Sequence, residues 1–222
     1  DLGIETSLTD LPNIQRKIMN SCAKLGKRSI VATHLLESMI ENPTPTRAEV
    51  TDVANAVYEG ADAIMLSGET SIGKYPVECV KFLKSISKRT EKFKTLEYEK
   101  ELITNSDWES IAVAARDLSE SINADGIIAV TRTGSTAGYI SNAKPKDIPI
   151  YTFTNNLNTL NQLSLVGSVI PFYLKRLNNH KKTLEHVRDV LKSLHRKKKL
   201  KFVMVSGIFS EKHSEAIQII NF

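Results

Sequence analysis

Apolar residues follow two kinds of pattern over the first ninety positions. They recur every three or four residues over 12–25, 46–60 and 76–88, which predicts three amphipathic helices. Between these helices, 29–33 and 63–66 are short apolar runs, as expected for strands buried on both faces. Helix and strand alternating in this order is typical of a (β/α)8 barrel. A complete barrel takes about 250 residues, so we expect only its last two strands with their helices.

The second half predicts a separate small α/β domain. Strands are expected at 126–130, 149–153, 168–174 and 202–206, with helices over 106–122, 136–142, 156–163 and 182–194. The final run 215–221 alternates well enough to pair with 202–206 as an antiparallel hairpin. The fold class is therefore α/β, in which the last strands and helices of a barrel precede a mostly parallel sheet with a closing hairpin.

Domain boundaries follow from a change in composition. Residues 92–105 alternate lysine and glutamate and contain few apolar side chains. We predict that 1–92 form the C-terminal part of a (β/α)8 barrel, that 93–105 form a linker or an exposed helix extension, and that 106–222 form the C-terminal α/β domain. The sequences Thr46 to Glu49 and Ser106 to Glu109 each match a capping box at a helix start.

Composition and charge exclude several classes of protein. The 222 residues are 41% hydrophobic and 25% charged, begin at Asp1, and contain no signal segment and no run near the ~20 apolar residues of a membrane helix. We therefore expect a cytoplasmic protein, and a fragment of a longer one. Cys22 and Cys79 are expected to be reduced thiols. The net charge of +5 and the basic run 196–201 suggest nucleic-acid binding, but no aromatic residues are interleaved for base stacking.

Candidate chemistry lies where the two predicted barrel strands end. Thr33 and His34 follow the first strand, and Ser67 and Glu69 follow the second. Ligand sites of parallel α/β folds are built from loops at the carboxyl ends of the strands. For Glu69, capping of the next helix is an alternative to a role in chemistry.

The stretch IVATHLLESMIENPTPTRAEVTDVANAVYEGADAIMLSGET resembles the core signature of the pyruvate kinase family, with its segments ATQMLESM, PTRAE, DVANAV and MLSGET in the same order. The resemblance is strong from Asp1 to about Lys92. It implies a glycolytic phosphotransferase that converts phosphoenolpyruvate and ADP to pyruvate and ATP, with Mg²⁺ or Mn²⁺ and K⁺ as cofactors, and a cytoplasmic homotetramer. It implies neither nucleic-acid nor membrane binding, and it makes 106–222 the regulatory domain.

The resemblance also assigns residue roles. It implies that Asp1 ligates the divalent cation and contacts the substrate, while Thr33 lies over the enolpyruvate and relays its proton. His34 stands where glutamine is usual and would contact the substrate and change the pH response. Ser67 and Glu69 match the catalytic segment that flanks the pocket and orders water. Arg47 and Glu49 match positions at a subunit interface, although Glu49 is also expected to cap its helix.

A second group of residues resembles the family's effector loop. The positions that would bind an allosteric phosphate are Thr131, Arg132, Thr133, Gly134, Ser135 and Thr136, at the start of a predicted helix. A plain Ser/Thr helix cap is the alternative. The partner loop 208–213 contains Glu211, which would repel a second phosphate, so an effector with one phosphate, or none, is expected.

Several parts of the family's site are missing from this sequence. The potassium ligands, the arginine and lysine that face the phosphate, the second metal carboxylate and the lid domain all belong to earlier strands. We therefore expect the chain to be inactive alone. Alternatives are a free-standing phosphate-binding regulatory module or pseudoenzyme, and a nucleic-acid binder that uses its basic tail.

Overall fold

The computed structural model describes residues 6–175, 180–195, 199–206 and 216–222. The chain divides into two compact units, which we call unit 1 (Asp1–Ile103) and unit 2 (Thr104–Phe222), and each is described by itself. Within the described residues, no helix has the length and apolar character needed to cross a membrane.

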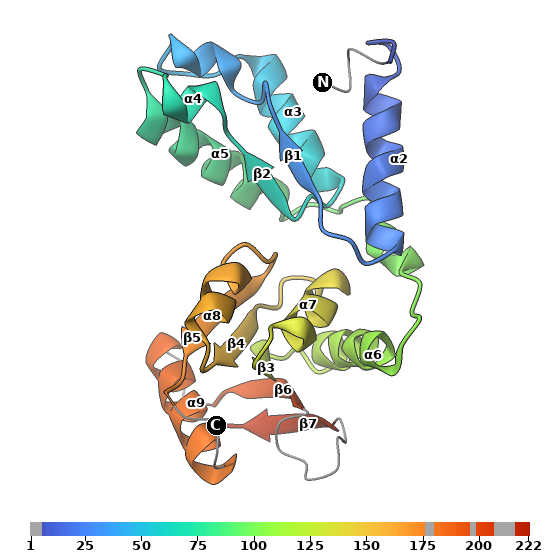
Figure 1. The fold of residues 1–222 in the computed structure, drawn as a ribbon, viewed down its shortest axis with the longest axis vertical. Helices are drawn as coiled ribbons and strands as arrows, with labels where there is room; N and C mark the ends of the chain where they lie inside the picture. The colour runs from blue at the N-terminus through green and yellow to red at the C-terminus, as the bar shows by residue number, and fades with distance from the viewer. Residues whose placement is uncertain (1–5, 176–179, 196–198, 207–215) are drawn as a thin grey trace. The chain divides into compact units, whose positions relative to one another are not determined.

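Unit 1 alternates helices with two short strands (Figure 1). Its elements are α2 (Leu11–Lys24), β1 (Ile30–Ala32), the 3-10 helix η1 (Glu37–Ile40), α3 (Arg47–Tyr58), β2 (Ala63–Met65), α4 (Gly68–Ser71), α5 (Pro76–Thr90) and the 3-10 helix η2 (Tyr98–Glu101). Strands β1 and β2 pair in parallel, with Val31 opposite Ile64. Val31 and Ile64 pack against a core of Leu35, Leu36, Met39, Val53 and Cys79. The predicted helices and strands of this half are confirmed, with ends shifted by a few residues.

The segment that follows α5 does not continue as one helix. Helix α5 ends at Thr90, and the chain then makes a single 3-10 turn, η2. Main-chain hydrogen bonds attach the segment to the rest of unit 1, because Leu96 N–H donates to Tyr58 O at 3.0 Å and Ile103 N–H donates to Lys24 O at 2.8 Å. The segment is therefore hydrogen-bonded to the rest of unit 1 and does not extend α5, although most of its side chains are exposed.

Unit 2 is built on a five-stranded sheet. Its elements are α6 (Asp107–Ser121), β3 (Gly126–Val130), α7 (Ser135–Asn142), β4 (Ile150–Thr154), α8 (Leu157–Leu163), β5 (Val169–Tyr173), α9 (His180–Leu194), β6 (Lys201–Ser206) and β7 (Ala216–Asn221). The strand order is β5-β4-β3-β6-β7, and all neighbours are parallel except β6 and β7. The predicted parallel sheet and its closing antiparallel hairpin are confirmed.

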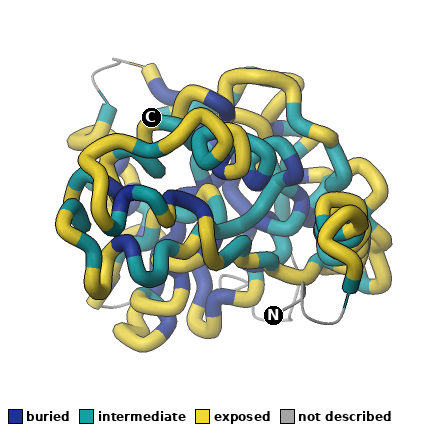
Figure 2. Tube along the Cα trace, turned by 90° about the horizontal axis from the view of Figure 1, so that it is seen from above, coloured by how far each residue is buried: buried dark blue, intermediate teal, exposed yellow. Residues whose placement is uncertain are grey.

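Helices cover both faces of this sheet (Figure 1). Apolar residues of α6, α7 and α8 pack on one face, and Val187 and Leu191 of α9 pack on the other. Strands β3 and β4 are consequently buried at every position, and Figure 2 shows such buried stretches in dark blue. The long apolar runs of the sequence therefore correspond to central strands with two covered faces.

The two predicted capping boxes differ in the structure. At α3 the box is complete, because Glu49 N–H donates to Thr46 Oγ1 at 3.3 Å and Thr46 N–H donates to Glu49 Oε2 at 2.7 Å. At α6, Ser106 Oγ accepts from Glu109 N–H at 3.3 Å, but the Glu109 carboxylate accepts from Asn105 N–H at 2.7 Å. Only one of the two predicted hydrogen bonds of the second box is therefore present. The Glu109 carboxylate binds the amide of the residue before the N-cap instead of the N-cap amide.

Candidate functional site

The turns after β1 and β2 form the candidate site of unit 1. The two strands are parallel neighbours, so their carboxyl ends lie at the same edge of the sheet. Thr33 and His34 follow β1, and Ser67 follows β2 as the N-cap of α4. The structure therefore brings the three predicted residues to one edge, although β1 and β2 lie far apart in sequence.

Thr33 and His34 adopt a strained backbone conformation. Their φ angles are +70° and +54°, in the left-handed region that is unfavourable for a β-branched residue such as threonine. Such residues cost about 1–3 kcal/mol each and cluster at functional sites. Thr33 is exposed, and its hydroxyl donates to Ala32 O at 2.6 Å. The His34 ring is 79% exposed and lies with Nε2 3.8 Å from Glu37 Oε2. Both side chains are open to a ligand.

Glu69 is a buried carboxylate between the two turns. It is 2% exposed, and its oxygens accept main-chain hydrogen bonds from Leu36 N–H at 3.1 Å and from Ser67 N–H at 2.7 Å. Burial raises the pKa of Glu69, but hydrogen bonds from the amides of Glu69, Ser67 and Leu36 and the nearby His34 lower it more, so the net pKa lies below the ordinary value. Ser67 is the N-cap residue of α4, so its hydrogen bond attaches Glu69 to the helix start, although no side chain of the described residues makes a cap hydrogen bond to α4.

Glycines allow the turn after β2 to pack closely. A Cβ on Gly73 would lie 2.4 Å from Glu69 O, which is too close for any side chain. A Cβ on Gly68 would lie 3.1 Å from Ile40 Cδ1. Lys74 N–H donates to Ile40 O at 2.8 Å, so η1 is attached to the same turn. The loop that begins at Thr33 and the loop that begins at Ser67 therefore pack against each other.

Glu49 fixes the loop between η1 and α3. Its carboxylate accepts four hydrogen bonds, from the N–H and hydroxyl groups of Ser38 and Thr46, at 2.6 to 2.8 Å. Burial raises the pKa of Glu49, but the hydrogen bonds of Ser38 and then Thr46 lower it below its ordinary value. The helix-capping role expected for Glu49 is therefore observed, and its carboxylate also binds Ser38 in η1.

The predicted effector loop of unit 2 forms the turn between β3 and α7. Gly134 has φ +88° and is the N-cap of α7, and its N–H donates to the buried Thr131 hydroxyl at 3.0 Å. Thr133 Oγ1 and Ser135 Oγ are 2.9 Å apart, and Thr159 Oγ1 donates to Arg132 O at 2.9 Å. Among the described residues, no side chain accepts from the first-turn amides of α7, but the Thr131 hydroxyl accepts from its N-cap amide, so the anion site and the plain Ser/Thr cap both stay predictions. The arrangement resembles an anion site at a helix N-terminus.

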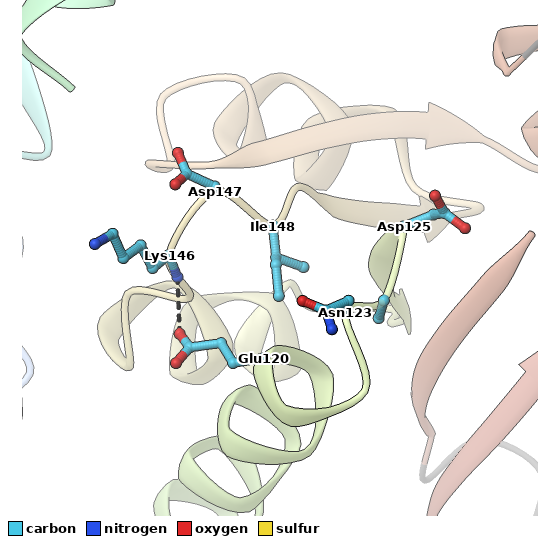
Figure 3. Close-up of a pocket in the computed structure, with 7 residues that line it drawn as sticks. Glu120, Asn123, Asp125, Lys146, Asp147 and Ile148 are labelled. Carbon is cyan, nitrogen blue, oxygen red and sulfur yellow. Dashed lines mark hydrogen bonds between the residues drawn. The ribbon is translucent and has the colours of Figure 1, made fainter. Parts of the chain in front are cut away.

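A pocket of about 390 Å³ lies at the other end of this sheet (Figure 3). It is lined by Glu120, Asn123, Ala124, Asp125, Lys146, Asp147 and Ile148, where β3 and β4 begin. Figure 3 shows the Glu120 carboxylate accepting from Lys146 N–H, at 2.9 Å. Sequence reasoning did not select these residues. Their spacing matches no motif, and the only local signal is that Asn123 and Asp147 are residue types that favour the left-handed conformation that both adopt.

Part of the predicted site falls outside the described residues. Asp1, the expected metal ligand and substrate contact, lies there, and so does the loop 208–213 with Glu211. Within the described residues, no group of three or more histidine, cysteine, aspartate or glutamate side chains is placed to hold a metal ion. Both Glu69 oxygens already accept from main-chain amides. The described residues therefore do not form a metal site by themselves.

Comparisons with known proteins agree over both units. Residues 1–80 match the family model described as "Pyruvate kinase, barrel domain", and residues 109–220 match "Pyruvate kinase, alpha/beta domain". The pyruvate kinase of Thermotoga maritima is 43% identical over 198 residues, which are 87% of this chain and 41% of the relative. Pyruvate kinase 2 of Synechocystis is 39% identical over 195 residues, 88% of this chain and 33% of the relative.

A solved structure gives the same result for the fold. The crystal structure of a pyruvate kinase from Cryptosporidium parvum matches 98% of this chain and 44% of its own length, with a TM-score of 0.88 and 28% sequence identity. The chain spans between about one third and just under one half of the length of these relatives.

Proposed function

Because the chain belongs to the pyruvate kinase family, we propose that it forms the C-terminal part of an enzyme that transfers the phosphoryl group of phosphoenolpyruvate to ADP. The observation that carries this proposal is that the strained turn at Thr33 and His34 and the turn at Ser67 lie at the same edge of the β1–β2 sheet. Strain at the carboxyl end of a strand is typical of a ligand site.

In this proposal the side chains of unit 1 act on the enolpyruvate and not on the phosphate. The exposed Thr33 hydroxyl relays the proton that converts the enolate to pyruvate, and Ser67 flanks the same position. His34, whose side chain is 79% exposed, contacts the substrate. Mg²⁺ or Mn²⁺ would neutralise phosphate charge, with Asp1 as its ligand in this chain, and K⁺ would bind through residues outside it.

Phosphoryl transfer depends on positive charges and metal ions around the phosphate. The family resemblance places a lysine, an arginine and a second metal carboxylate in earlier strands that are not in this sequence, so we expect this chain alone not to turn over. Unit 2 would bind an effector with a single phosphate at Thr131–Thr136, through Arg132 and the α7 N-terminus. Tetramer formation and a cytoplasmic location stay predictions from the family resemblance.

The experiment is a coupled assay that follows pyruvate formation from phosphoenolpyruvate and ADP. It compares the 222-residue chain with a chimera in which the N-terminal part of the Thermotoga maritima relative precedes Asp1. We expect turnover by the chimera only. In the chimera, Thr33→Ala should lower kcat about 100-fold or more, as for loss of a proton-transfer group. Thr51→Ala, on the exposed side of α3, is the matched control and should leave kcat unchanged.

Two results would contradict the proposal. Ordinary turnover by the 222-residue chain would show that the missing charges are not needed. An inactive chimera that still binds inorganic phosphate at unit 2 would favour the alternative, a phosphate-binding regulatory module. The observation that supports this alternative is the turn before α7, in which Gly134 N–H donates to the Thr131 hydroxyl at the start of the helix.

A further inference from the structure

The two oxygens of Glu69 are engaged in a way that does not suit proton transfer. A general acid or base must lie within hydrogen-bond reach of the reacting atom or of one intervening water, and a carboxylate shielded from solvent does not offer this. Glu69 is 2% exposed, and its oxygens accept from the main chain, Oε1 from Leu36 and Oε2 from Ser67. The lowered pKa of the group also keeps it ionised across the neutral range. These contacts indicate a role other than the catalytic one inferred from sequence.

Burying a charged carboxylate costs free energy unless its oxygens accept hydrogen bonds. A buried charge is tolerated when it is hydrogen-bonded, and a buried N–H group left without a partner costs about 1–3 kcal/mol. An apolar side chain at position 69 would leave the amides of Leu36 and Ser67 without their acceptor. A carboxylate offers two acceptors on one rigid, planar group, so it can hold two amides of different turns at a fixed separation.

One of these amides belongs to the strained turn. Leu36 N–H follows the left-handed pair Thr33 and His34 by two residues, and the Leu36 side chain is fully buried in the core of unit 1. A threonine stays in the left-handed region only when the surrounding structure holds it there. The hydrogen bond from Leu36 therefore acts at the point where the turn rejoins the core.

The backbone of Glu69 is itself held from the other side. Cys79 Sγ donates to Glu69 O at 3.7 Å, and Gly73 packs so closely that a Cβ would lie 2.4 Å from the same oxygen. Glu69 thus connects α5 and the turn after β2 to the turn after β1. A shift at either turn would have to break a charge-assisted hydrogen bond.

We infer that Glu69 is a positioning residue, whose carboxylate joins the turn after β1 to the turn after β2 and fixes the Thr33 hydroxyl relative to Ser67. The functional part of this inference rests on the proposed function, because only that proposal places Thr33 and Ser67 beside the enolpyruvate. The link between the two turns is independent of the reaction.

The link is testable by NMR spectroscopy on the 222-residue chain. In the wild type, the amide signals of Leu36 and Ser67 should titrate with the same midpoint as the Glu69 carboxyl carbon, and each amide nitrogen should couple to that carbon through the hydrogen bond. In Glu69→Gln, amide hydrogen exchange at both residues should rise about tenfold or more, since one acceptor is replaced by a donor. Glu69→Asp keeps two acceptors on a shorter stem and should restore part of the protection.

Glu37→Gln is the matched control, because it removes the same charge from an exposed side chain beside His34. It should leave the Leu36 and Ser67 amides unchanged. The amides of β3 in unit 2 serve as an internal reference for folding. If Glu69→Gln unfolds unit 1, the inference is tested by the wild type alone, through the titration of the two amides and their coupling to the Glu69 carboxyl carbon.

Activity provides a second measurement that separates this inference from the proposed function. In an active chimera, Glu69→Gln should lower kcat about tenfold or more with a smaller change in KM, and Glu69→Asp should recover part of kcat. Amides of Leu36 and Ser67 that neither titrate with Glu69 nor respond to Glu69→Gln would overturn the inference, whatever the activity. An inactive chimera together with titrating amides would overturn the proposed reaction and leave the link supported.

Discussion

Units 1 and 2 carry similar apolar strand sequences but bury them to different degrees. In unit 2, every residue of β3 and β4 is buried, because each strand has a neighbour on both sides and helices cover both faces. In unit 1, β1 and β2 pair only with each other in the described part of the chain, and Ile30 and Met65 are 65% and 46% exposed. An apolar run therefore predicts a strand, and its neighbours decide whether that strand is buried.

The two units are also held together by different interactions. Unit 2 has two large apolar clusters, one on each face of its sheet. Unit 1 has one smaller cluster, and two carboxylates hold its loops through hydrogen bonds. Apolar burial stabilises by about 25 cal/mol per Å², whereas a net hydrogen bond contributes about 1 kcal/mol. Unit 2 should therefore be the more stable of the two.

The largest expected effect is in hydrogen exchange on the intact chain. Amides of β3 should exchange about a thousandfold or more slowly than those of β1, because opening the central strand requires unfolding of unit 2. Exchange followed by mass spectrometry on peptides covering 126–130 and 30–32 measures this ratio. Equal protection of both strands would contradict the comparison, and would mean that unit 1 gains stability from contacts other than its own sheet.

A pair of core substitutions should sharpen the same contrast. Phe153 is fully buried and its ring lies 5.3 Å from that of Phe172, so Phe153→Ala should lower the free energy of unfolding of unit 2 by about 3–5 kcal/mol. Met65→Ala should change that of unit 1 by less than about 1 kcal/mol, because nearly half of the side chain is exposed.

Urea denaturation can separate the two responses. Trp108 is the single tryptophan of the chain and lies in unit 2, so its fluorescence reports on that unit, while circular dichroism reports on both. If Met65→Ala lowers the free energy of unfolding as much as Phe153→Ala does, then Met65 contributes more to stability than its exposed side chain indicates, and the comparison of the two units fails.

Much of this architecture was predictable from the sequence. Periodicity located the strands of both units, and β3 was placed without error at 126–130. The complete capping box at Thr46 followed from residue types at fixed spacing, since both hydrogen bonds are local. Local patterns of this kind need no knowledge of the tertiary structure.

The geometry of the candidate site was not predictable in the same way. The left-handed conformations fall on Thr33 and His34, which are not the glycine or asparagine that would signal them. The hydrogen bond from Leu36 to Glu69 joins residues 33 positions apart, and no local pattern predicts such a pair. Thr33, Ser67 and Glu69 were all predicted as site residues, but the hydrogen bonds that join Glu69 to both turns were not predicted.

The smallest expected effect, and the last test of the comparison, is a difference in pH response. Glu49 and Glu69 have lowered pKa values in folded unit 1, so their contribution is present above the ordinary glutamate pKa of about 4.3 and is lost as the pH falls through the folded values. Burial, and then the charge of Asp125, raises the pKa of Tyr151 in unit 2. Its contribution is therefore present below the ordinary tyrosine pKa of about 10 and is lost as the pH rises through the folded value.

Acid should thus weaken unit 1 first, and alkali should weaken unit 2 through Tyr151. Unit-specific hydrogen exchange at several pH values, corrected for the intrinsic rate, measures both slopes. Glu49→Gln should flatten the acid slope of unit 1 only. Tyr151→Phe, which removes the contact with His195 Nε2 at 2.9 Å, should flatten the alkaline slope of unit 2 only. If either variant changes the slope of the other unit, the two units do not unfold independently, and the difference in burial between their sheets cannot be converted into separate stabilities.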